Sequence, residues 1–305
     1  TQAGVLLREP LPTLGDAKPE WLIVNALESE LVQTVMYRTL SEHGPAVMAA
    51  AVRLAATLGA RRACLVVDRK LGKRWPAGAS PKTDTPPATA RLRIVRLSAH
   101  YPAGATPLVI HSVTGREIPY LGRAADVGVF IIDPVALLHL GRAVDTSTPQ
   151  TWQPVTVAGD AVQAPGCYRV PLGTPLAHIA RKVGVTLSAA APAIVGDLLS
   201  GGGLDWQTSP PSVLTKQDHT LIFQRPTLTV ERLPVACIRC GECLDHCPVG
   251  LDPRAILDRV ERRRLDQLAP LSPAACLDCG LCDFVCPSAL PLMRAVQRAR
   301  HHVHP

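Results

Sequence analysis

The chain has 305 residues, enough for two domains or for one domain with an appendage. Hydrophobic residues make up 47% of it, and this content excludes a disordered chain. No run approaches the roughly 18 apolar residues of a membrane span, so we expect a soluble globular protein. The formal charge of +7 indicates only a weak preference for acidic partners.

The first part of the chain alternates between strand-like and helix-like patterns. WLIVN and ACLVVD are apolar runs of strand length, and the Ala-rich segment 44–58 between them has helical spacing. Residues 71–91 are rich in Pro, Gly, Ser and Thr and predict a long loop. A further strand, a turn, and then another strand and helix follow in RLRIVRL, YPAGATP, VGVFIID and VALLHLGRAV. This order predicts an α/β lobe with parallel strands, which we place at residues 1–149.

A compact module with a connecting segment is predicted next, over residues 150–232. VTVAGDAV and GCYRVPLGTPLAHIARKVGV are typical of two short strands, a turn and an amphipathic helix. TLIFQ then predicts a closing strand.

Eight of the ten cysteines lie between Cys237 and Cys286. They form two runs, CIRCGECLDHCP and CLDCGLCDFVCP, that share the spacing C-x2-C-x2-C-x3-C-P. In bacterial two-cluster ferredoxins the fourth Cys of such a run ligates the other cluster. We therefore predict two [4Fe-4S] clusters with crossed ligation in a helical, ferredoxin-like domain over residues 233–305. The predicted ligands are Cys237, Cys240, Cys243 and Cys286 for the first cluster, and Cys276, Cys279, Cys282 and Cys247 for the second.

Two structural zinc sites are the alternative, because C-x2-C pairs also suit tetrahedral zinc. Gly241 and Gly280, in the middle of each run, favour backbone that wraps closely around inorganic sulfide. Cys64 lies in an apolar run and is expected to be a buried small hydrophobe, and Cys167 is expected to have no special role. No catalytic residue is predicted.

With these motifs, the chain resembles the RnfC subunit of Rnf electron-transport complexes and, more distantly, the flavin-bearing NADH-oxidising subunit of complex I. WLIVNALESE looks like the family's N-G-A-E-C-E loop, and YPAGATP and TGREIP look like its Y-P-x-G and T-G-R-E motifs. VTVAGDAVQAPGCYRVPLGTPL looks like its small β-grasp (SLBB) module. The resemblance implies an α/β lobe with a degenerate FMN-binding fold, an SLBB-like module and the two-cluster domain.

One departure from the family concerns the flavin. The glycine-rich loop that cradles FMN phosphate and NADH is replaced here by AGVLLREPLPTLG, with Glu9 and Pro10 where small residues are needed. We therefore predict that the chain holds no stoichiometric FMN and has no NADH site of its own. Glu28 and Glu30 align with the family's acidic pair beside the flavin, and they are the cofactor-binding residues if a flavin is retained.

The predicted function is an iron–sulfur electron-transfer subunit that relays single electrons within a larger redox complex. The resemblance places it on the cytoplasmic face of the inner membrane, with membrane contact only through partner subunits. The expected partners are those subunits and, from the charge, an acidic ferredoxin or flavodoxin; nucleic acid is not expected. The opening TQAGVLLREP has no pattern of an export signal, in keeping with this location.

Two other functions stay open. One is an FMN-dependent oxidoreductase subunit linked to NADH, ferredoxin or flavodoxin. The second is a scaffold protein whose clusters are structural.

Overall fold

The protein is described by a computed structural model that covers residues 18–70, 92–186, 193–204, 212–226 and 233–303. The chain divides into two compact units. The first comprises Thr1–Ile118 and Arg123–Pro226, and the second comprises Pro119–Gly122 and Thr227–Pro305. The predicted loop at 71–91 and the replaced glycine loop around Glu9 and Pro10 lie outside the described residues.

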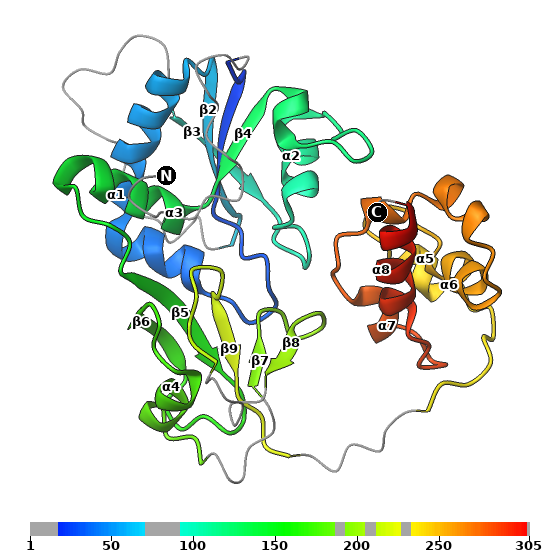
Figure 1. Ribbon diagram of the computed structural model, residues 1–305. Helices are drawn as coiled ribbons and strands as arrows, with labels where there is room; N and C mark the ends of the chain where they lie inside the picture. Colours follow the sequence, from blue (N-terminus) through cyan, green and yellow to red (C-terminus); the bar gives the residue numbers. More distant parts are fainter. Residues whose placement is uncertain (1–17, 71–91, 187–192, 205–211, 227–232, 304–305) are drawn as a thin grey trace. The chain divides into compact units, whose positions relative to one another are not determined.

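A sheet of parallel strands forms the centre of the first unit (Figure 1). Apolar runs of strand length build it, and the strands at its centre are almost entirely buried, as strands covered by helices on both faces must be. In spatial order the strands are β3 (Leu92–Leu97), β2 (Arg62–Asp68), β1 (Trp21–Asn25) and β4 (Val129–Ile132). The α/β prediction for this part of the chain is therefore confirmed.

Helices cover both faces of this sheet. Figure 1 shows α1 (Val35–Leu58) and α3 (Pro134–Thr146) together on one face and α2 (Thr106–Thr114) on the other. The chain leaves β1 through α1 toward β2, and it later returns from β3 through α2 and η2 (Ala124–Val127) to β4 on the opposite side of β1. This reversal makes a topological switch point between β1 and β4, and open α/β sheets bind ligands beyond the carboxyl ends of their strands at such points.

Helix α1 begins earlier than the sequence predicts. The Ala-rich pattern predicted a helix from Gly44, but the helix starts at Val35 and continues through Pro45. His43, two residues before the proline, departs from helical geometry with φ −125°. Proline removes one helical hydrogen bond and its ring crowds the preceding turn, so it produces a kink at this place rather than a helix start.

A second sheet completes the first unit, and it contains the strands and helix predicted for this module. In spatial order its strands are β6 (Gly166–Pro171), β5 (Trp152–Ala158), β9 (Thr220–Ile222), β7 (Ala193–Val195) and β8 (Gly202–Leu204). Helix α4 (Leu176–Lys182) packs its buried Leu176, Ile179 and Ala180 against strands β5 and β9. β9 is the last of these strands in the sequence, yet it lies in the middle of the sheet.

Hydrogen bonds join the two sheets through the loop that follows β1. The backbone N–H of Leu31 donates to Asp197 Oδ2 at 3.1 Å, and the N–H of Thr34 donates to Thr156 Oγ1 at 2.9 Å. The loop from β1 to α1 is thus held from both sides.

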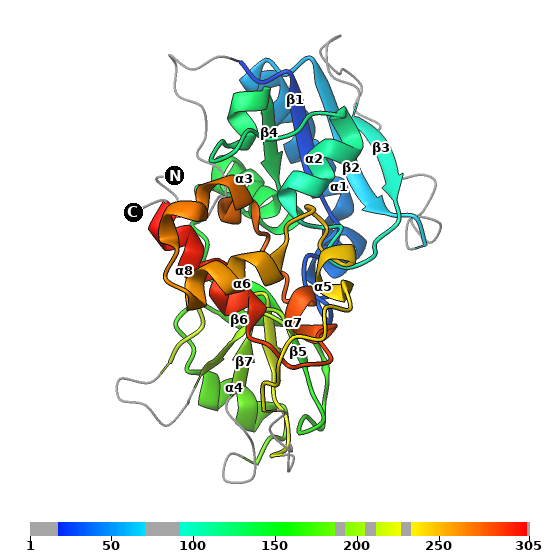
Figure 2. The same cartoon turned by 90° about the vertical axis from the view of Figure 1, so that its right-hand side faces the viewer.

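The second unit is built from short helices around the cysteine runs, as predicted. The helices are α5 (Glu242–Asp245), α6 (Pro253–Glu261), α7 (Leu281–Phe284) and α8 (Leu292–Val303), with 3-10 turns η4 (Leu265–Gln267), η5 (Ala269–Leu271) and η6 (Pro273–Ala275). Helix α6 packs against α8, and both lie side by side in Figure 2. The helix predicted through the ERRR segment ends at Glu261, and Arg263 adopts a left-handed φ of 56° that breaks it. Among the described residues, none of the helices is long and apolar enough to cross a lipid bilayer.

Candidate metal centres

The two cysteine runs fold into loops with the same backbone path. In both, the residue midway between the first two cysteines has a left-handed φ, 57° at Arg239 and 53° at Asp278. Its N–H donates to the first sulfur at 3.4 Å, to Cys237 Sγ in one loop and to Cys276 Sγ in the other. The repeat in the sequence is therefore a repeat in structure.

The first loop surrounds a cavity of about 420 Å³. Three of its cysteines line the cavity together with Cys286, which comes from the second run. A charge on Cys286 also raises the pKa of the Cys243 thiol, after the larger effects of burial and of Asp252. The cavity is lined by the four thiols that the crossed spacing predicts for one cluster: Cys237, Cys240, Cys243 and Cys286.

The second loop shows the reciprocal arrangement. Burial raises the pKa of the Cys279 thiol, and a charge on Cys247, from the first run, adds to the shift. Cys247 and Cys276 pack on one apolar cluster with Leu251, whose N–H donates to Cys247 Sγ at 3.3 Å. The predicted second set, Cys276, Cys279, Cys282 and Cys247, is therefore drawn from both runs in the same way.

Burial and nearby carboxylates keep these thiols protonated in the protein alone. Burial, followed by the charge of Asp283, raises the pKa of the Cys282 thiol to about 12. A cysteine must lose its proton to bind a metal, and a bound cation supplies the charge that favours this loss.

Single zinc ions fit the first cavity poorly. Thiolates surround zinc at about 2.3 Å, so a zinc site is far smaller than the space at this loop. Within the described ranges, no three His, Cys, Asp or Glu side chains are grouped so as to hold one metal ion.

The acidic pair expected beside a flavin is partly engaged in structure. Glu28 is half-buried, and its carboxylate accepts hydrogen bonds from the N–H of Met36 at 3.3 Å and of Tyr37 at 2.8 Å. It therefore caps the first turn of α1. Burial raises its pKa to about 7 against these two bonds, and the nearby charge of Glu30 contributes in the same direction.

Two of the motifs that carry the family resemblance meet at the end of β1. The Asn25 side chain donates to the carbonyl of Gly104 at 2.9 Å and accepts from the N–H of Leu27 at 3.2 Å. A Cβ atom on Gly104 would lie 2.5 Å from the carbonyl oxygen of Glu28, so only glycine allows this approach. The Y-P-x-G motif thus packs directly on the loop that carries the acidic pair.

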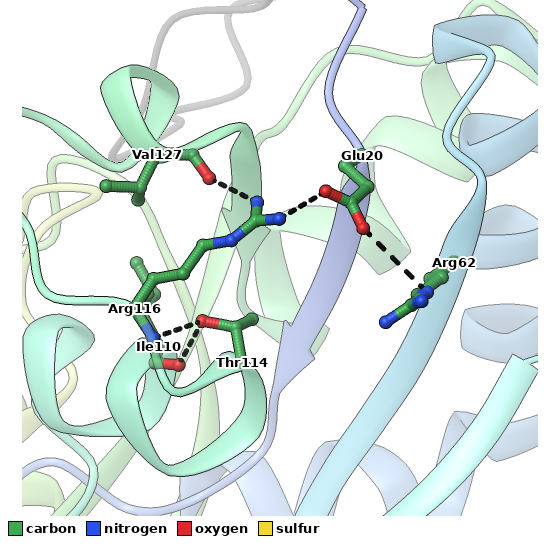
Figure 3. Close-up of polar contacts among 6 residues, drawn as sticks. All are labelled: Glu20, Arg62, Ile110, Thr114, Arg116 and Val127. Carbon is green, nitrogen blue, oxygen red and sulfur yellow. Dashed lines mark hydrogen bonds and ion pairs between the residues drawn. The ribbon is translucent and has the colours of Figure 1, made fainter.

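The third motif also serves the sheet, as Figure 3 shows. Arg116 donates to the carbonyl of Val127 at 2.7 Å and to Glu20, which in turn lies 3.8 Å from Arg62. The N–H of Arg116 donates to Thr114 Oγ1 at 3.1 Å. These contacts tie the end of α2 to the segments that enter β1, β2 and β4.

The remaining cysteines behave as expected. Cys64 is buried, and burial raises its pKa to about 12. Cys167 is half-buried and packs on Val35, Met36 and Val135.

Sequence reasoning missed one set of polar contacts at the second loop. Asp278 Oδ1 accepts from Arg300 Nη2 at 2.7 Å and from Gln297 Nε2 at 3.3 Å, both on α8. The only signal in the sequence is the contrast between CIRC and CLDC, which places an arginine and an aspartate at equivalent positions.

Comparison with known families defines the class of protein. Residues 11–139 match the Nuo51 FMN-binding domain, and residues 236–290 match the 4Fe-4S dicluster domain. The chain thus joins an α/β lobe of the Nuo51 type to an iron–sulfur domain of the two-cluster type.

Full-length relatives narrow this class to homologues of RnfC, which confirms the predicted resemblance. The chain is 29% identical to the RnfC protein of the ion-translocating oxidoreductase complex of Citrobacter koseri over 253 residues, 79% of this chain and 34% of that protein. It is 32% identical to the protein of the same name from Salmonella arizonae over 184 residues, 56% of this chain and 27% of that protein. The chain spans about a third of the length of the curated relatives it matches.

Solved structures share the fold. An NAD+-reducing [NiFe]-hydrogenase in the H2-reduced state superimposes with a TM-score of 0.59 at 19% identity, over 95% of this chain and 58% of that chain. Its air-oxidised form gives a TM-score of 0.56 at 18% identity, over 84% and 49% of the two chains.

Proposed function

We propose that the protein is an iron–sulfur electron-transfer subunit that relays single electrons through two [4Fe-4S] clusters. The observation that carries this proposal is the cavity at the first loop, because its lining brings Cys286 from the second run to three cysteines of the first. Such an arrangement suits a cubane cluster shared between two loops.

Each residue set has a defined task in this proposal. The four thiolates of each set hold one cluster, and the N–H groups of Arg239 and Asp278 donate to its sulfur ligands. Hydrogen bonds to cluster sulfurs and the exclusion of water tune the reduction potential. A bound cluster supplies the chemistry, which is the uptake and release of one electron.

Metal analysis and one substitution test this proposal. The chain purified anaerobically is expected to contain iron and sulfide for two clusters and no zinc. Cys247→Ser is expected to disturb the EPR signal of the cluster bound by Cys276, Cys279 and Cys282. Damage confined to the cluster of Cys237, Cys240 and Cys243 would contradict crossed ligation, and zinc without iron would contradict the proposal as a whole.

The proposal extends to the partners. The relatives are named as subunits of an ion-translocating oxidoreductase complex, and we propose that this chain also works in a redox complex, peripheral on the cytoplasmic face of a membrane. The complex would supply the membrane contact, and an acidic ferredoxin or flavodoxin would be a donor or acceptor. Size-exclusion chromatography of native extract tests this, because elution at the monomer mass without other subunits would contradict it.

The same proposal excludes a stoichiometric flavin. Glu9 and Pro10 stand where the family has glycines, and backbone N–H groups must approach a phosphate closely to bind it. Flavin fluorescence after anaerobic purification and denaturation is the test. One FMN per chain would favour the alternative of a flavin-dependent oxidoreductase, which the match to an FMN-binding domain supports.

We also propose an SLBB-like β-grasp assignment for the second sheet and domains at 1–149, 150–232 and 233–305. The support is the pairing of strands around α4, together with the division of the chain between Pro226 and Thr227. Limited proteolysis is expected to separate a fragment that begins near residue 233. Clusters that no reductant can reduce would instead favour the structural scaffold.

A further inference from the structure

The two cluster loops differ in charge at positions that the repeat makes equivalent. The residue between the first two cysteines is Arg239 in the first loop and Asp278 in the second. The residue after the third cysteine is Leu244 in the first loop and Asp283 in the second. A guanidinium and an apolar side chain thus stand where the other loop has two carboxylates.

Both carboxylates of the second loop are fixed in place. Asp278 is held by Arg300 and Gln297 from α8, and Arg300 offsets its charge in part. Asp283 is half-buried, accepts from the N–H of Met293 at 2.8 Å, and lies 3.9 Å from Cys282 Sγ. Buried charge is poorly screened, so Asp283 acts strongly on a cluster held by that sulfur.

The first loop has the opposite surroundings. Cys237 and Cys240 are exposed, and Ile238 between them is 66% exposed. Arg239 and Arg254 line the cavity against a single carboxylate there, Asp252.

Two further carboxylates on the first loop act through water. Glu242 and Asp245 are exposed, and Glu242 lies 3.3 Å from His246 Nδ1. Solvent screens both of them. The charges that are not screened by water therefore favour the first loop for added negative charge.

We propose that Arg239 and the exposure of the first loop give the cluster held there the higher reduction potential, whereas Asp278 and Asp283 lower the potential of the other. This inference rests on the proposed function. Reduction adds negative charge to a cluster, which water and arginine stabilise and which burial and carboxylates oppose. A one-electron donor that loses one electron reduces the first-loop cluster first, with no proton transferred, and the exposed sulfurs make this loop the place where electrons enter or leave.

Potentiometric EPR on the whole chain tests the proposal. Two separate reduction steps are expected. Arg239→Gln is expected to shift the higher step to lower potential, and Asp278→Asn is expected to shift the lower step to higher potential. Asparagine adopts left-handed φ readily and still accepts from Arg300, so the second variant keeps the loop geometry.

A matched control is available in the same unit. Arg263 is exposed and has a left-handed φ of 56°, close to the 57° of Arg239, but it lies at the end of α6 and does not line the cavity. Arg263→Gln is expected to move neither step.

The outcomes separate this inference from the proposed function. Two clusters that reduce at one potential, or an Arg239→Gln shift in the lower step, would overturn the inference and leave the relay intact. A chain without iron–sulfur signals would overturn both.

Discussion

The α/β lobe and the cluster domain carry family motifs in different ways. In the lobe, the motif side chains bond to the lobe itself: Asn25 to Gly104, Glu28 to the first turn of α1, and Arg116 to Val127 and Glu20. In the cluster domain, the motif cysteines line a cavity. The first kind of motif maintains a fold, whereas the second provides ligands.

The largest effect is expected for a cysteine that links the two runs. Cys286→Ala should abolish the first cluster and lower the iron content by about half, because a cubane needs its fourth thiolate. The unfolding of the first unit should stay unchanged. Iron analysis and calorimetry on the same sample measure both quantities.

Cys64→Ala is the control for this prediction, since Cys64 is a buried cysteine of β2 outside both runs. It should keep all the iron and reduce the stability of the first unit. Loss of iron from this variant would break the contrast between the lobe and the cluster domain.

Asn25→Ala should destabilise the first unit by about 2–4 kcal/mol. The substitution leaves the buried N–H of Leu27 and the carbonyl of Gly104 without the side chain that now bonds both, and each lost partner is costly. Chemical denaturation measures the change. A value near zero would mean that Asn25 is kept for a ligand rather than for the fold.

Gly104→Ala should cost about 1–3 kcal/mol, because the new Cβ would overlap the backbone at Glu28. Gly202→Ala in β8 is the matched control, since a Cβ there meets nothing within 4 Å. Equal losses in the two variants would contradict a specific contact between the two motif loops.

Glu28→Gln should change the pH dependence of stability by about 1–2 kcal/mol. The fold raises the pKa of Glu28 from its ordinary 4.5 to about 7, so the folded chain binds this proton more tightly than the unfolded chain. The resulting stability is fully present below pH 4.5 and is lost as the pH rises through about 7. The unfolding free energy of the wild type should therefore fall relative to that of the variant over this range, and parallel pH profiles would contradict the assignment.

Sequence patterns predicted the elements of the fold better than their ends. The buried run WLIVN identifies β1 without ambiguity because both faces of the strand are covered. The start of α1 was wrong because Gly44 and Pro45 look like a helix start, whereas packing of Val35, Met36 and Leu40 carries the helix through them.

The cluster site was predictable in its ligands and unpredictable in its surroundings. Fixed spacing places four sulfurs around one cavity, since short loops allow few backbone paths. The pairing of Asp278 with Arg300 joins a loop to a later helix, and no local pattern encodes a contact of that kind.

The central position of β9 has a consequence for synthesis on the ribosome. β5 pairs with β9 in parallel, and β7 pairs with β9 on its other edge, so residues 220–222 complete the sheet. Strands β5 to β8 cannot assemble in their final order until these residues have left the exit tunnel. Because the cysteine runs follow β9 in the chain, the second sheet can close only shortly before the cluster ligands emerge.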